Sequence, residues 1–84
     1  MINEEIRAAI LEAGYKAAKR TGSIKGSLFM LYEISKDWGE SKEKIEFNAN
    51  YLSEIGVLKW ESSHGGMRIT AEGVKEYERT HEVE

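Results

Sequence analysis

Seven polar or basic side chains in the second half of the chain could contact nucleic acid. Lysine and arginine pair with phosphate groups, and an asparagine side chain can hydrogen-bond to the edge of adenine. Lysines at the N-terminus of a helix are especially well placed for phosphate contacts. The candidate DNA-contacting residues are Lys42, Lys44, Asn50, Ser53, Lys59, His64 and Arg68.

Other residues of the same stretch oppose DNA binding. On a helical wheel at about 100° per residue, the side opposite the apolar face carries Glu43, Glu46, Phe47, Asn50, Ser53 and Glu54. Three of these six are carboxylates, which phosphates repel. Phe47, beside the partly outward Tyr51, either packs under a following hairpin or forms the centre of a protein contact, because aromatic anchors are enriched at interfaces.

No arrangement of residues indicates catalysis or metal binding. His64 and His81 lack the spacing of metal ligands, and the chain contains no Cys. Carboxylate pairs such as Glu4 with Glu5 are expected from the composition alone. The glycines near position 65 do not form a phosphate-binding loop, because no Lys-Ser or Lys-Thr follows them in a strand–loop–helix motif. We therefore expect a protein that is not an enzyme and uses no cofactor and no metal.

The composition fits one small folded domain. The chain has 84 residues, of which 40% are hydrophobic and 32% charged, enough apolar content for a core but near the size at which one core struggles to stabilise itself. A homodimer that completes the core is therefore one expected state. The net charge of -3 weighs against binding nucleic acid through the overall field, although a local basic patch could still do so. The lack of Cys, of a signal-peptide pattern and of an apolar run of about 20 residues leads us to expect a cytoplasmic protein that contacts no membrane.

Helical spacing predicts two helices in the first half of the chain. Apolar residues recur at steps of three and four over 4–20, with Gly22 just beyond, and again over 28–38, with Gly39 just beyond. The large apolar side chains of the second helix are expected in the core: Phe29, Met30 and Trp38.

A third helix is predicted over 42–55. Ser41 is its expected N-cap, and Gly56 is expected to end it in the left-handed conformation. The side expected to face the core carries Ile45, Asn48, Ala49, Leu52, Ile55 and Gly56.

A hairpin and a last helix complete the predicted elements. Apolar and polar residues alternate over 57–61 and again over 67–70, as in two half-buried strands. Thr70 is expected to cap a helix that ends near Arg79, and the tail 80–84 is expected to be disordered. Because no linker or repeat divides the chain, we expect a single α+β domain over 1–84.

Two of these segments resemble winged helix-turn-helix domains of prokaryotic regulators. Residues 51–58, YLSEIGVL, resemble the end of a recognition helix that leads into the wing, and residues 68–73, RITAEG, resemble the return strand of the wing and the helix behind it. The resemblance extends over 4–77. It implies a three-helix core with a small antiparallel hairpin wing at 57–70 and a C-terminal helix. It also implies a short strand at 23–25 that pairs with the edge of the hairpin.

The resemblance implies a DNA-binding transcriptional regulator that uses the third helix, about 42–55, and the wing, 57–70, often as a dimer on double-stranded DNA. The alternative is a winged-helix adaptor with little or no DNA affinity, which binds another protein around Phe47 and Tyr51. The distinguishing feature is whether the cations form one surface or are separated by carboxylates. The cations concerned are Lys42, Lys44, Lys59 and Arg68, and the carboxylates are those of Glu43, Glu46 and Glu54.

Overall fold

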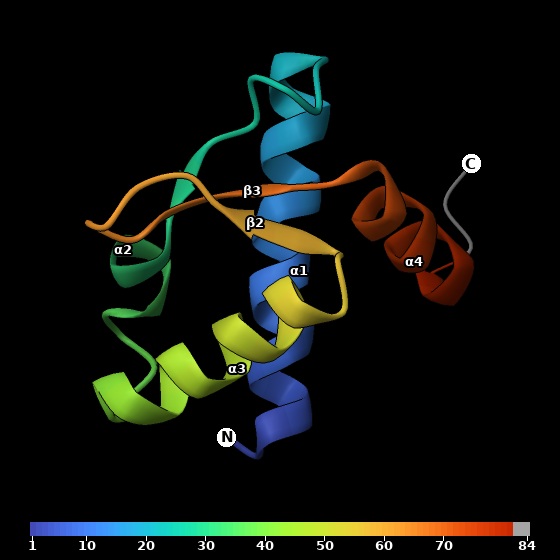
Figure 1. The fold of residues 1–84 in the computed structure, drawn as a ribbon. Helices are drawn as coiled ribbons and strands as arrows, with labels where there is room; N and C mark the ends of the chain where they lie inside the picture. The colour runs from blue at the N-terminus through green and yellow to red at the C-terminus, as the bar shows by residue number, and fades with distance from the viewer. Residues whose placement is uncertain (82–84) are drawn as a thin grey trace.

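A computed structural model describes residues 1–81 of the chain. Over these residues the fold is α+β, with four helices and one three-stranded antiparallel sheet in the order β1-β3-β2. Figure 1 shows the elements in chain order. They are α1 (Asn3–Thr21), β1 (Phe29–Met30), α2 (Leu31–Ser35), α3 (Lys42–Glu54), β2 (Leu58–Trp60), β3 (Gly66–Ile69) and α4 (Ala71–His81).

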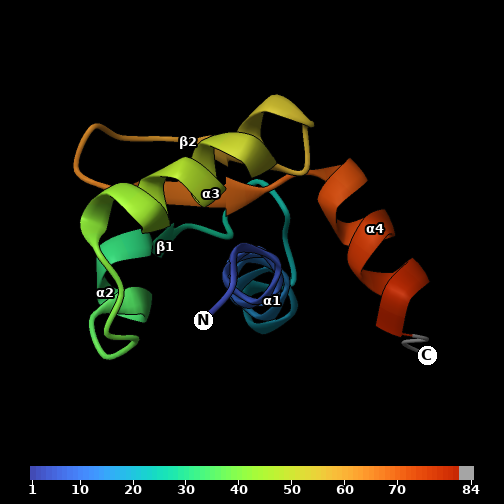
Figure 2. The ribbon, with the colours of Figure 1, turned by 90° about the horizontal axis from the view of Figure 1, so that it is seen from below.

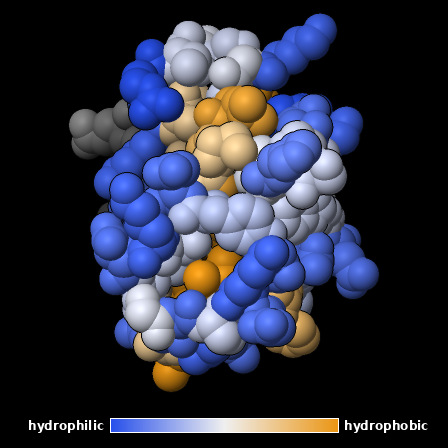
Figure 3. Space-filling model, turned by 90° about the vertical axis from the view of Figure 1, so that its left-hand side faces the viewer, coloured by the Kyte–Doolittle hydropathy of each residue, from blue (hydrophilic) through white to orange (hydrophobic). Residues whose placement is uncertain are grey.

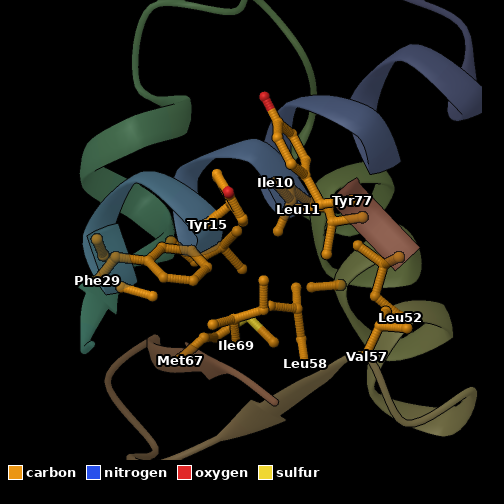
Figure 4. Packing of buried hydrophobic residues seen from close by; sticks show 14 of the residues in the cluster. Ile10, Leu11, Tyr15, Phe29, Leu52, Val57, Leu58, Met67, Ile69 and Tyr77 are labelled. Carbon is orange, nitrogen blue, oxygen red and sulfur yellow. The ribbon is translucent and has the colours of Figure 1, made fainter. Parts of the chain in front are cut away.

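Helix α1 forms the centre of the molecule. In Figure 1 the strands β2 and β3 cross over α1. Figure 2 looks nearly along α1 and shows α3 and the sheet on one side of it, with α2 and α4 at opposite ends of the molecule. The core lies between α1, α3 and the sheet (Figure 4). Its largest fully buried side chains include Ile6, Ile10, Leu31, Leu58, Met67 and Ile69. Each buried aliphatic side chain of this kind contributes about 1.5–3 kcal/mol to folding.

The predicted first helix is confirmed, together with its end. Gly22 adopts φ 71°, and its N–H donates to the carbonyl of Ala18 at 2.9 Å, which closes the last turn of α1. A Cβ on Gly14 would lie 3.1 Å from the side chain of Leu58 and 3.2 Å from that of Ile69. A residue without a side chain at this position therefore lets α1 approach the sheet closely.

The predicted strand at 23–25 is wrong, and the predicted helix at 28–38 is correct only over Leu31–Ser35. Residues 24–27 form a turn, in which the hydroxyl of Ser27 donates to the carbonyl of Ile24 at 2.6 Å. The strand begins six residues later than predicted, at β1, where Phe29 is opposite Met67 of β3. Only α2 is helical in the second predicted segment, because the N–H of Leu31 donates to the carbonyl of Gly65 and the residues before it pair with the sheet.

The core assignments in this segment are correct only in part. Phe29 is buried, and Trp38 is partly buried against the core. Met30 is exposed, since successive residues of a strand point to opposite faces and Phe29 takes the inward position.

The third helix begins and ends as predicted, within one residue. The hydroxyl of Ser41 accepts a hydrogen bond from the N–H of Lys44 at 3.2 Å, and Gly56 has φ 84°. Ile45, Asn48, Ala49 and Leu52 are buried as expected. Ile55 and Gly56 are exposed instead, because Ile55 follows Tyr51 by four residues on the outer face, and Val57 is the next residue that is buried in the core.

The hairpin and the last helix are confirmed. Leu58 pairs with Ile69 and Trp60 with Met67, and the hydroxyl of Thr70 caps α4 by accepting from the N–H of Gly73 at 3.0 Å. A Cβ on Gly73 would collide with the carbonyl oxygen of Val57, so this position of the helix requires glycine.

The end of α4 differs from the expected disordered tail over 80–84. Thr80 and His81 belong to α4, and the ring of His81 stacks on Tyr77 at 3.9 Å between centroids. The remainder of that tail, 82–84, lies outside the described residues. None of the described helices is both long and apolar enough to cross a bilayer.

Candidate nucleic-acid and protein interface

Three large apolar side chains line the outer surface of α3 and its end. Phe47 is 58% exposed, Tyr51 42% and Ile55 54%. They follow one another at intervals of four residues, and residues at such intervals lie on one face of a helix. Ile55 keeps helical dihedral angles at the C-cap and so continues the row. We call these three residues the apolar stripe. Its exposure shows that Phe47 does not pack under the hairpin.

A buried polar network supports the stripe from behind. Asn48 is fully buried, accepts a hydrogen bond from Nε of Arg7 at 2.9 Å and donates to Oδ1 of Asn3 at 3.0 Å. The guanidinium of Arg7 lies 3.8 Å from the ring centroid of Tyr51. The first turns of α1 therefore hold Tyr51 in place and leave part of its ring exposed.

Carboxylates flank the stripe on its outer side. Glu43 lies one turn before Phe47, and Glu54 lies three residues after Tyr51; both are exposed. Glu46 is partly buried and accepts a hydrogen bond from the hydroxyl of Tyr32. This hydrogen bond raises the pKa of the Tyr32 phenol. The outer surface of α3 is therefore acidic as well as apolar.

The two lysines at the start of α3 are turned to opposite sides. Nζ of Lys44 lies 3.2 Å from Oε1 of Glu40 and donates to the carbonyl of Met1 at 2.6 Å. Hydrogen bonds from the Met1 amino group and from Lys44 lower the pKa of Glu40. Nζ of Lys42 instead lies 5.3 Å from the ring centroid of Tyr32, on α2. The two ammonium groups therefore do not form one phosphate site.

The polar candidates in the middle of α3 are partly used within the fold. Oδ1 of Asn50 accepts a hydrogen bond from the indole N–H of Trp60 at 2.9 Å, which ties α3 to β2. Ser53 is partly buried, and its carbonyl accepts from the N–H of Gly56 at 3.1 Å. Asn50 nevertheless remains exposed.

The hairpin brings two of the predicted cations together. Lys59 on β2 is directly opposite Arg68 on β3. Nε of Arg68 also lies 2.5 Å from Oε1 of Glu61, so part of this positive charge is neutralised. His64 is exposed in the turn, where its backbone N–H donates to the hydroxyl of Ser62.

The structure thus unites only Lys59 and Arg68 among the predicted DNA-contacting cations. Two features of the surface were missed from the sequence. Ile55 was assigned to the core, although its spacing of four from Tyr51 and eight from Phe47 indicates a common row. The pairing of Lys44 with Glu40, four residues earlier, also follows a helical spacing, but Glu40 precedes the helix and gave no such signal.

A second apolar surface lies on another side of the molecule. A hollow of about 460 Å³ is lined by residues of α1, β1 and α2, among them the exposed Leu28 and Met30 and the cations Lys16 and Arg20. Figure 3 shows the side of the molecule that carries α2, where orange apolar side chains lie between blue hydrophilic ones. A smaller hollow of about 270 Å³ lies between the end of α1 and α4. Residues 1–81 contain no group of three or more side chains suited to hold a metal ion.

Comparison with known proteins adds no further information on this surface. No family model, no curated protein and no solved structure matches the chain.

Proposed function

We propose that this chain is a winged-helix module that binds another protein through the outer surface of α3. The order helix, strand, two helices, hairpin and helix, with β1 at the edge beside β3, supports the winged-helix part of the proposal. The apolar stripe of Phe47, Tyr51 and Ile55 is the observation that carries the binding part. Exposed aromatic and aliphatic side chains in one row are typical anchors of protein contacts.

The charge distribution favours a protein over DNA as the partner of α3. A helix that reads the major groove offers Arg, Lys, Asn or Gln to base edges. Here the outer surface offers Asn50 between Glu43, Phe47 and Glu54, the Oδ1 atom of Asn50 is bonded to Trp60, and Lys44 is held by Glu40 on the flank. The proposal assigns no catalytic role and no cofactor, and it places the protein in the cytoplasm, in keeping with a sequence without Cys.

Selection from a displayed random-peptide library tests this proposal. The immobilised protein, its Phe47→Ala variant and a Leu28→Ala variant are screened side by side, after circular dichroism has verified that all three are folded. Leu28→Ala is the matched control, because it truncates an exposed apolar residue outside the stripe. We expect enriched sequences that bind the parent and the control but not Phe47→Ala. A lack of enriched peptides, or peptides that bind the Phe47→Ala variant as well as the parent, contradicts the proposal.

A DNA-binding transcriptional regulator is the second candidate, favoured by the Lys59–Arg68 pair on the hairpin and by the exposed Lys42. In this form of the proposal the wing supplies the phosphate contacts. Titration against random duplex DNA at low salt, with Lys59→Glu and Arg68→Glu, tests it. Affinity that falls steeply with salt and is lost in both variants supports DNA binding, whereas no binding at low salt excludes it. Lys44→Glu is the matched control, since Lys44 is already paired.

A further inference from the structure

We infer that the partner of α3 is a basic amphipathic segment of another protein, with apolar side chains that cover the stripe and Lys or Arg on its borders. This inference rests on the proposed function and specifies its partner. Two observations carry it: the carboxylates beside the stripe, and the contacts within the fold that already engage Lys44 and Arg7.

The carboxylates at the outer border of the stripe are not neutralised by ion pairs within residues 1–81. Glu43 and Glu54 are exposed and have no ion-pair partner among residues 1–81. The cations closest to the inner border are already engaged, since Lys44 pairs with Glu40 and Arg7 lies over Tyr51. A partner that approaches the stripe therefore meets a negative border, which a lysine or arginine would complement.

The charges also argue against a second copy of this chain on the same surface. A two-fold dimer would place each stripe against its own symmetry mate, because such an interface uses the same patch on both subunits. Glu43 and Glu54 of one copy would then face the same carboxylates of the other. Like charges brought together in this way oppose association.

The length of the stripe defines the size of the contact. Phe47 and Ile55 are eight residues apart, which corresponds to about 12 Å at the helical rise of 1.5 Å per residue. An amphipathic partner helix of about two turns, with apolar residues at intervals of three and four, spans the same distance. The partner motif is therefore short, and its contact surface is smaller than that of a permanent dimer.

Two synthetic helical peptides with identical leucine positions provide the test. One carries lysine and the other glutamate at the positions beside the leucines, and binding to the full chain is followed by fluorescence anisotropy at low and at high salt. We expect the lysine peptide to bind at least about tenfold more tightly than the glutamate peptide, which corresponds to about 1.4 kcal/mol. We also expect this preference to shrink with salt.

Variants of the chain connect this preference to the stripe. Phe47→Ala should abolish binding of the lysine peptide, and the double variant Glu43→Lys with Glu54→Lys should reverse the peptide preference. Asp37→Lys with Glu72→Lys, two exposed carboxylates outside the stripe, is the matched control for the change in net charge and should leave the preference unchanged. Circular dichroism verifies the fold of each variant. Equal binding of both peptides, or a preference that the control double variant reverses equally well, overturns the inference.

The library selection separates this inference from the function on which it rests. Enriched peptides that depend on Phe47 but carry no excess of Lys or Arg would overturn the basic partner while supporting protein binding. No enrichment would overturn both. Self-association that depends on concentration and disappears in Phe47→Ala would identify a second copy as the occupant and overturn the basic partner.

Discussion

The two sides of α3 differ in what their side chains do for the fold. On the inner side, Ile45, Ala49 and Leu52 are buried in the core that α3 shares with α1 and the sheet. On the outer side, Phe47 and Tyr51 have comparable hydrophobic size but remain exposed. The inner residues stabilise the fold through burial, whereas the exposed surface of the outer residues contributes no such burial.

The polar residues of the two sides show the same contrast. Asn48, on the inner side, has all its hydrogen bonds within the protein, whereas Asn50, on the outer side, makes one bond to Trp60 and is otherwise exposed. A surface whose polar and apolar groups both remain available is suited to a contact with another molecule. The difference therefore predicts that stability and binding depend on different residues of the same helix.

The largest expected effect on stability is at Leu52. Leu52→Ala leaves a cavity beneath α3 and should lower the free energy of unfolding by about 3 kcal/mol. Phe47→Ala, the matched change on the outer side, should alter it by less than about 0.5 kcal/mol. Urea unfolding followed by tryptophan fluorescence measures both. Similar losses in the two variants would show that the stripe belongs to the core and would remove the contrast.

The second largest effect on stability is expected at Asn48, because its hydrogen bonds join the inner side of α3 to Arg7 and Asn3 of α1. Asn48→Ala removes the partner of Arg7 and of Asn3 and should cost about 2 kcal/mol in the same unfolding measurement. Asn50→Ala is the exposed control and should cost less than about 1 kcal/mol. If Asn48→Ala proved as mild as Asn50→Ala, the network behind Tyr51 would not hold the two helices together.

Much of this contrast was predictable from local patterns. The spacing of Ile45, Ala49 and Leu52 identified the inner side, and Ser41 and Gly56 identified the ends of α3, because caps and periodicity act within a few residues. The assignment of Ile55 to the inner side was wrong, since its spacing of four residues from Tyr51 continues the outer row. The sequence therefore predicted the exposure of Phe47 and Tyr51, but it did not predict that Ile55 belongs to the stripe.

The wrong predictions concern features that depend on distant residues. Leu28, Leu31 and Ile34 have helical spacing, yet Phe29 lies in a strand because it pairs with Met67, thirty-eight residues later. The orientation of Lys44 likewise depends on Met1 and Glu40. Such contacts follow from the tertiary arrangement, to which the periodicity of a short window is insensitive.

Gly56 sharpens the comparison at the C-terminal end of α3. Its φ of 84° is unfavourable for a residue with a Cβ, so Gly56→Ala should destabilise the protein by about 1–2 kcal/mol. Gly26→Ala is the matched control, because Gly26 has no positive φ and a Cβ there would meet no atom closer than 3.9 Å. Thermal unfolding of the two variants measures the difference. Equal unfolding midpoints in the two variants would mean that the left-handed conformation of Gly56 does not determine the end of α3 or the exposure of Ile55.

The smallest expected effect is at Glu40, on the border between the two sides. Its pKa is lowered from the ordinary value of 4.5 by hydrogen bonds from the Met1 amino group and from Lys44. A carboxyl with a lowered folded pKa stabilises the protein fully above its ordinary pKa, and this contribution is lost as the pH falls through the folded value. The parent should therefore be slightly more stable than Glu40→Gln at neutral pH, and the two should converge in acid. Urea unfolding at several pH values measures the difference. If the parent and Glu40→Gln were equally stable at every pH, Lys44 would not be held by Glu40, and the charge argument against DNA at α3 would weaken.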